Sequence, residues 1–358
     1  MGSVFSLMLR VLLIALGVFC LVWQPDAAWV ERTYANGAYP SWEHAAFAVT
    51  NQLPWSLGDV AGLLGVVAIA WRIAIFSREP QRRRTWAGVG FVLLDIATIV
   101  ALYAIWFETS WGWNYARAPI ETRVEFDKSK ITTQAADELR TGVMSELNRL
   151  APIAHAHSTE PLNRVMLYDA WLPVVQRVGD AWTPDVGAPK GTIANPFMES
   201  TGTSGFINPF TLNVQLAGDV LWFERPFDLS HEWSHVAAYA REDEANYIAI
   251  VTCLRSNDPV MQYSGNLELF LYLPPKKHYS KRDFIPLVWQ DFKAIRQRDA
   301  RHINTILAHW SWQTYNAYLK SNRVASGIEN YNEVTRLVLG VPIDTDGLPT
   351  KTRRATKG

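Results

Sequence analysis

Three long apolar segments near the N-terminus constrain the fold of this chain more than any other feature. They cover residues 4–23, 57–76 and 86–107. Each is about twenty residues long, which is the length an α-helix needs to cross roughly 30 Å of hydrocarbon. We therefore expect a multi-pass membrane protein in which residues 1–107 form a three-helix transmembrane anchor in the lipid bilayer.

The first apolar segment has a second interpretation, as a cleavable signal peptide. Ala27 and Ala28 are small residues of the kind found near a cleavage site. The apolar core is long for a signal peptide, however, and two further spans follow it. An uncleaved helix is therefore the preferred interpretation.

The loop between the second and third spans sets the expected orientation. Four arginines occupy this loop at residues 77–85: Arg78, Arg82, Arg83 and Arg84. Positively charged loops of this length stay in the cytoplasm, which places the N-terminus inside and everything after Phe107 outside. We thus predict a protein of the bacterial cytoplasmic (inner) membrane with an extracytoplasmic domain.

Within the spans, Asp95 is expected to pair with Arg72.

Composition narrows the possible partners. The formal net charge is zero, so no whole-chain electrostatic surface for nucleic acid is expected. The chain has 16 tryptophans, and several lie near the ends of the apolar segments, where aromatic residues favour the bilayer interface. The two cysteines, Cys20 and Cys253, offer no disulfide framework.

The part after the third span is predicted to be mostly helical. Residues 108–340 are expected to form one extracytoplasmic domain, and residues 341–358, which lack an apolar pattern, a disordered tail. Thr133 is the expected cap of the first helix in this domain. The predicted helices cover residues 132–150, 161–182, 231–254, 281–320 and 327–339, and the best predicted strand covers residues 205–214.

One five-residue motif carries most of the functional information. The run His231-Glu232-Trp233-Ser234-His235 has the pattern HExxH, which on a helix sets two imidazoles one turn apart on one face. Two neutral imidazoles at this spacing can share one Zn²⁺ ion, and a carboxylate beside them can act as a general base. The motif predicts His231 and His235 as zinc ligands and Glu232 as the catalytic base. A pair of histidines without a metal is the alternative.

A zinc site with three protein ligands needs one more donor, and acidic residues follow at 242–244. On one unbroken helix Glu242 would lie about 10 Å beyond His235 along the axis, too far to share an ion. The helix must therefore break within residues 236–241, although this segment contains neither Gly nor Pro. Glu242 is the predicted third ligand and Glu244 the alternative. The acidic run could also simply complement the dipole of a second helix.

Several stretches together resemble a known family. The run from Ser230 through the HExxH motif to Asn246 is similar to the signature of the bacterial membrane family catalogued as domain of unknown function 3810. That family typically has Gly where this chain has Ala238. With the three spans, the other matching landmarks extend the resemblance over nearly the whole chain: Trp111 to Tyr115, Pro189-Lys190, Ser204-Gly205-Phe206, Pro209-Phe210, Ser326-Gly327 and Tyr331.

The motif block also resembles the membrane-embedded gluzincins, such as the CAAX prenyl proteases. Their third zinc ligand is the first Glu of a Glu-x-x-Ala-Asp motif, which corresponds to Glu242 here, and Asn246 takes the place of the Asp. The resemblance implies a zincin-like α+β domain, a Zn²⁺ cofactor and hydrolysis of peptide bonds in protein or peptide substrates. For the group that stabilises the oxyanion, we prefer Tyr331 over Tyr263 and Arg336.

A different function is compatible with the same residues. A zinc-binding membrane sensor or regulatory protein without turnover would use the outer domain to detect a ligand. Such a protein needs a cytoplasmic effector, and the inside loop at residues 77–85 is too short to be one. A zinc metalloendopeptidase is therefore the preferred hypothesis.

Overall fold

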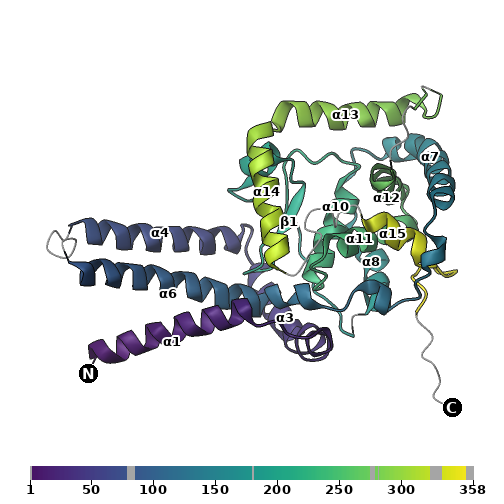
Figure 1. The fold of residues 1–358 in the computed structure, drawn as a ribbon. Helices are drawn as coiled ribbons and strands as arrows, with labels where there is room; N and C mark the ends of the chain where they lie inside the picture. The colour runs from purple at the N-terminus through teal and green to yellow at the C-terminus, as the bar shows by residue number, and fades with distance from the viewer. Residues whose placement is uncertain are drawn as a thin grey trace, which may run out of the picture.

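Three long helices extend together from one side of the molecule, as Figure 1 shows: α1 (Gly2–Val22), α4 (Leu57–Arg78) and α6 (Trp86–Ser110). Helix α6 packs against both of the others. Each is long and apolar enough to cross a membrane, as the sequence predicted. This computed structural model describes residues 2–78, 85–179, 181–274, 279–280, 282–322 and 333–351.

Charged groups within and at the ends of these helices have partners. Asp95 pairs with Arg72, which confirms the prediction, and also with Arg10 from α1. Asp59, near the start of α4, accepts hydrogen bonds from the Thr192 hydroxyl and the Ile193 amide, each at 2.9 Å. The carboxylate of Asp59 therefore fastens the anchor to the rest of the chain.

The remaining helices gather at the other end of the molecule around a large apolar core, beside a small second cluster of Met198, Ala217 and Val220. Helices α10, α11 and α12 pack against one another in this core, and α7 and α8 pack against them. The segments of this part, including those between α1 and α4, are α2 (Ala27–Trp29), the π-helix η1 (Val30–Ala38), α3 (Tyr39–Thr50), η2 (Gly112–Ala116), η3 (Ile120–Thr122), η4 (Lys128–Lys130), α7 (Thr133–Ala156), α8 (Arg164–Val178), α9 (Asn195–Thr201), α10 (Arg225–Val236), α11 (Glu242–Arg255), α12 (Pro259–Tyr272), α13 (Pro286–His302), α14 (Thr305–Ser321) and α15 (Val334–Gly340).

Side-chain caps explain where two of the predicted helices begin. Thr132, and not Thr133, caps α7, because its hydroxyl accepts a hydrogen bond from the Ala135 amide. The helix predicted over residues 281–320 is two helices, α13 and α14. Asn304 lies between them and caps the second one.

The predicted strand at residues 205–214 was wrong in extent. The chain instead forms an antiparallel hairpin of two short strands, β1 (Gly205–Ile207) and β2 (Val214–Leu216). The Asn208 side chain accepts a hydrogen bond from the Phe210 amide, and Leu212 takes a left-handed conformation with φ of 56°. These two features turn the chain where a longer strand was expected.

Residues 341–351 differ from the predicted disordered tail. Val341 and Leu348 are buried, and Ile343 forms an isolated β-bridge with Pro349. Lys351 forms a second bridge with Val124. This part of the chain therefore packs on the domain, whereas residues 352–358 lie outside the described residues.

Two glycines give a matched test of the core. A Cβ at Gly265, on α12, would lie 2.6 Å from Cys253 Cβ and 3.3 Å from Leu254 N on α11. Gly265→Ala should therefore lower the free energy of unfolding by about 1–3 kcal/mol, because α11 and α12 must separate. Gly142, on the exposed face of α7, has nothing within 4 Å of such a Cβ. Gly142→Ala should stabilise the protein by about 0.5–1 kcal/mol. Denaturant unfolding of both variants, compared with the wild type, tests the opposite signs.

Candidate metal centre

The HExxH motif lies on helix α10, as predicted. Pro226 occupies the first turn of this helix, where a missing amide hydrogen costs nothing. The side chains of His231 and His235 are 12% and 8% exposed, so both rings are almost enclosed by protein. Their ring centroids are 4.6 Å apart and their planes perpendicular. The spacing of the motif thus places both imidazoles on one buried face.

Helix α10 ends at Val236, which confirms that the helix breaks after the motif. The Ala238 amide donates to the His235 carbonyl at 2.9 Å, and the Tyr239 amide donates to the Ser234 carbonyl at 3.0 Å. Ala238 itself has φ of 70°. This is the Schellman arrangement that commonly ends a helix, here with Ala in the left-handed position that Gly usually occupies. A non-Gly residue in that conformation costs roughly 1–2 kcal/mol.

Side chains from the membrane-proximal segments satisfy the carbonyls at the end of α10. The Tyr39 hydroxyl donates to Val236 O at 2.8 Å, and Arg117 Nη1 donates to Ala237 O at 3.2 Å. Trp111 Nε1 donates to His235 O at 3.4 Å. The carbonyls at a helix end need partners from outside the helix, so the three side-chain donors, together with the Ala238 amide on His235 O, stabilise the reversal of the chain.

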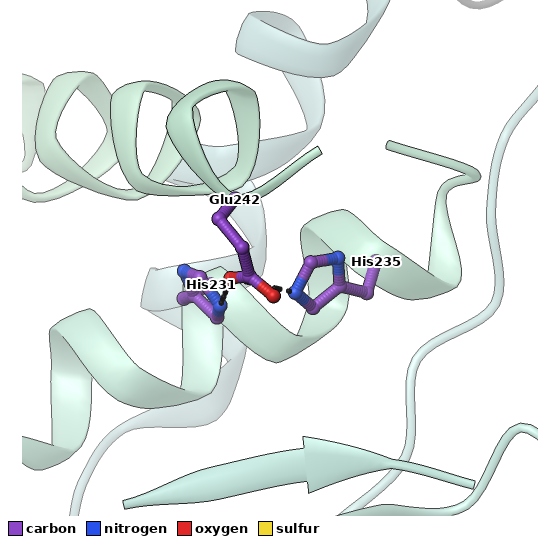
Figure 2. A group of neighbouring side chains, drawn as sticks. All are labelled: His231, His235 and Glu242. Carbon is purple, nitrogen blue, oxygen red and sulfur yellow. Dashed lines mark ion pairs between the residues drawn. The ribbon is translucent and has the colours of Figure 1, made fainter. Parts of the chain in front are cut away.

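The reversal brings Glu242, the first residue of α11, back to the two histidines. Its Oε2 atom lies 3.3 Å from His231 Nε2 and 3.5 Å from His235 Nε2. Figure 2 shows the carboxylate between the two rings. Donor atoms that share a tetrahedral zinc ion at about 2.0–2.1 Å are about 3.3 Å apart. The three residues could therefore hold such an ion with little movement.

The hydrogen bonds around these ligands fit a metal site. Nδ1 of His235 lies 2.7 Å from the Tyr239 carbonyl, which can only accept, so Nδ1 carries a hydrogen and Nε2 is the nitrogen that could bind a metal once it is deprotonated. The Tyr315 hydroxyl, from α14, donates to Glu242 Oε1. Glu242 Oε2 is buried and has no hydrogen-bond partner among the described residues. A buried carboxylate oxygen facing two imidazole nitrogens is the donor set of a zinc site.

The charge of Glu242 dominates the electrostatics of this group. Burial by itself would raise the pKa of Glu242, but the two histidines hold it well below its usual range. Burial by itself would lower the pKa of His235, but Glu242 and Glu232 outweigh it and raise this pKa to about 9. Burial prevails at His231 and lowers its pKa, with the charge of His235 acting in the same direction and Glu242 and Asn246 acting against it. The negative charge of Glu242 is thus balanced by positive charge on His235.

Glu232 lies on the same helix as the two histidines, and its carboxylate approaches the hairpin. A Cβ on Gly205 of β1 would lie 2.6 Å from Glu232 Oε1, so the absence of a side chain at this position makes room for the carboxylate. Its other oxygen, Oε2, is buried and has no hydrogen-bond partner in the described part of the chain. Burial is the main reason that the pKa of Glu232 rises to about 8, and Glu242 and Asp228 add to it. The group is thus poised to bind and release a proton near neutral pH.

The neighbouring acidic residues of α11 face elsewhere. Glu244 Oε1 accepts a hydrogen bond from the Ile120 amide at 2.9 Å. Asp243 pairs with Arg241 at 3.4 Å. Both carboxylates also lie in the first turn of α11, where negative charge favours the helix dipole. Of the acidic run, only Glu242 is grouped with the histidines.

The predicted oxyanion groups are not brought to the ligands by the described part of the chain. Tyr263 donates its hydroxyl to Asp291, and Arg336 binds Glu121 at 2.8 Å. Tyr331 lies outside the described residues. Tyr315 was not predicted, because it lies on a distant helix and no spacing in the sequence links it to the motif.

The family comparison covers both the anchor and this site. Residues 34–339 match the family model described as a protein of unknown function, DUF3810. The chain belongs to the DUF3810 family. The match includes the last two spans, the HExxH helix and Glu242. No curated protein and no solved structure matches the chain.

The site gives a direct test of which carboxylate could bind metal in this DUF3810 protein. Glu242→Ala should abolish zinc binding, because two histidines alone make a poor zinc site. Glu244→Ala should retain zinc, because its carboxylate faces Ile120 and not the histidines. Zinc content per purified chain, determined by mass spectrometry, decides between them. Loss of zinc in Glu244→Ala alone would show that the wrong residue has been chosen.

Proposed function

We propose that the chain is a membrane-anchored, zinc-dependent metallopeptidase that hydrolyses peptide bonds of extracytoplasmic or membrane-proximal protein substrates. One observation carries the proposal. The Glu242 carboxylate lies 3.3 and 3.5 Å from the two histidines of an HExxH helix, with Glu232 buried beside them. Histidine pairs on one helix turn, a third carboxylate and an adjacent glutamate are the parts that metal-assisted peptide hydrolysis requires.

His231, His235 and Glu242 would hold the zinc ion. Bound there, zinc would supply a Lewis acid that polarises the scissile carbonyl and makes a water more acidic. Tyr315 is a positioning residue in this scheme, since its hydrogen bond to Glu242 Oε1 leaves Oε2 facing the histidines. The Tyr239 carbonyl does the same for His235.

Glu232 is the residue that moves the proton. Its carboxylate would accept a proton from the attacking water and then deliver it to the leaving amine. Its pKa of about 8 in this buried position suits both steps, because the group can be charged or neutral near neutral pH. The Gly205 position keeps that carboxylate in place, since any side chain there would displace it.

The hairpin offers a place for an extended substrate. Within the described residues, the sheet has only the strands β1 and β2, so the edge of β1 away from β2 is not covered by a third strand. A peptide could add to such an edge through main-chain hydrogen bonds, beside Glu232. The hairpin also contacts the start of α4: Gln215 Nε2 donates to Ser56 Oγ at 2.6 Å. Substrates near the membrane surface are therefore favoured.

The orientation of the chain is part of the proposal. We place the α4–α6 loop in the cytoplasm and the HExxH domain outside, because the loop carries the cluster of arginines. A reporter enzyme that is active only in the cytoplasm, fused after Phe107, should be inactive. A fusion within the arginine loop should be active. The reverse pattern would overturn this topology.

Substitution of Glu232 tests the enzymatic role. Glu232→Gln should keep the fold and the zinc but lower the rate of peptide hydrolysis ~10²- to 10⁴-fold or more, because the amide cannot accept a proton. His231→Ala should lose zinc and activity together. Cleavage of peptide libraries by the detergent-solubilised protein, with zinc determined on the same samples, provides the measurement.

The same experiment separates the enzyme from the sensor. A zinc-binding sensor would show no hydrolysis even in the wild-type protein. Full activity of Glu232→Gln, with contaminating proteases excluded by the inactivity of His231→Ala, would remove Glu232 from the mechanism.

A further inference from the structure

A second group of potential metal ligands lies away from the HExxH helix. Glu43 and His44, on α3, meet Asp185 from the segment between α8 and α9. His44 Nδ1 is 2.7 Å from Asp185 Oδ2 and 3.1 Å from Glu43 Oε2. One nitrogen and two carboxylate oxygens thus converge from two parts of the chain that are far apart in sequence.

Glu43 is the unusual member of this group. Its side chain is completely buried, and neither of its oxygens has a hydrogen bond of good geometry within the described residues. Burial, with the nearby charge of Asp185, raises the pKa of Glu43 to about 9, and the Asp185 backbone amide offsets this only in part. A buried carboxylate beside a second carboxylate needs either a proton or a positive ion to balance its charge.

We propose that Glu43, His44 and Asp185 form a second cation site, which binds one divalent transition-metal ion and ties α3 to the segment at Asp185. One imidazole with two carboxylates suits zinc or manganese better than calcium, which takes only oxygen ligands. The site is separate from the proposed peptidase centre, because within the described residues its ion pairs involve only Glu43, His44 and Asp185 and none of the HExxH ligands.

The geometry allows an ion to enter with small movements. The three donor atoms lie within 4.8 Å of one another. The distances from His44 Nδ1 to Glu43 Oε2 and to Asp185 Oδ2 are both shorter than the separation of about 3.3 Å between ligand atoms of a tetrahedral zinc ion. The side chains of His44 and Asp185 would therefore move apart by roughly half an ångström. His44 and Asp185 are 48% and 51% exposed, so they are free to do this while the buried Glu43 stays in place.

An ion at this position would stabilise the segment that supports the HExxH helix. Asp185 is two residues before Gly187, whose carbonyl accepts a hydrogen bond from Trp233 Nε1 at 3.2 Å. Gly187 also packs closely on α3, since a Cβ there would lie 3.1 Å from Phe47 Cε1. The ion would therefore join the segment between the first two spans to the residues that contact α10.

The test uses the full-length protein in detergent with the first site removed by His231→Ala and His235→Ala. After chelator treatment, Zn²⁺ is added back by equilibrium dialysis and bound zinc is counted by mass spectrometry. This double variant should bind one zinc ion per chain and gain roughly 3 °C or more in Tm when zinc is present. Adding Asp185→Asn, an exposed substitution that should preserve folding, should weaken zinc binding at least ~10-fold.

Two further variants keep the result interpretable. Glu43→Gln should weaken zinc binding in the same way, and its Tm without zinc shows whether the neutral side chain is tolerated in the core. His157→Ala is the matched control, because His157 is an exposed histidine with a single carboxylate partner, Glu160, at 2.8 Å. It should leave zinc binding unchanged. A double variant that binds no zinc, or equal zinc affinity with and without Asp185→Asn, would overturn the proposal and leave a proton on Glu43 as the balancing charge.

Discussion

The end of helix α10 is the feature on which the rest of the site depends. If the helix continued, Glu242 would lie about 10 Å past His235 along the axis, and no group of three ligands would exist. Ala238 in its left-handed conformation and the two hydrogen bonds of the Schellman arrangement turn the chain within a few residues. Helix α11 then starts at Glu242 and runs beside α10, so one backbone reversal creates the site.

That reversal is stabilised from outside the helix pair, by parts of the chain that flank the candidate membrane spans. Tyr39 comes from the segment between the first two spans, and Trp111 and Arg117 follow the third span directly. Their side chains donate hydrogen bonds to the carbonyls of residues 235–237 at the end of α10. The three apolar helices are therefore structurally continuous with the site.

Much of this arrangement could be predicted from the sequence, and the predictions that were wrong or missing have identifiable physical reasons. Apolar length gave the three spans, and the distance argument required a helix break before Glu242. The break itself could not be located in advance, because Ala238 adopts a conformation for which Gly is the usual signal. Tyr315 was missed because a tertiary contact between distant helices leaves no periodic pattern. The hairpin was predicted as one strand because β-forming residues lie on both sides of Asn208 and Pro209, although these two residues are a turn signal.

The central claim is that the converging side chains of His231, His235 and Glu242 bind zinc. The most direct measurement is anomalous diffraction at the zinc absorption edge from crystals of the full-length protein grown without added chelator. We expect an anomalous peak about 2.0–2.2 Å from Nε2 of both histidines and from a Glu242 oxygen. A well-ordered site with zinc in the crystal but no peak between these three residues would contradict it.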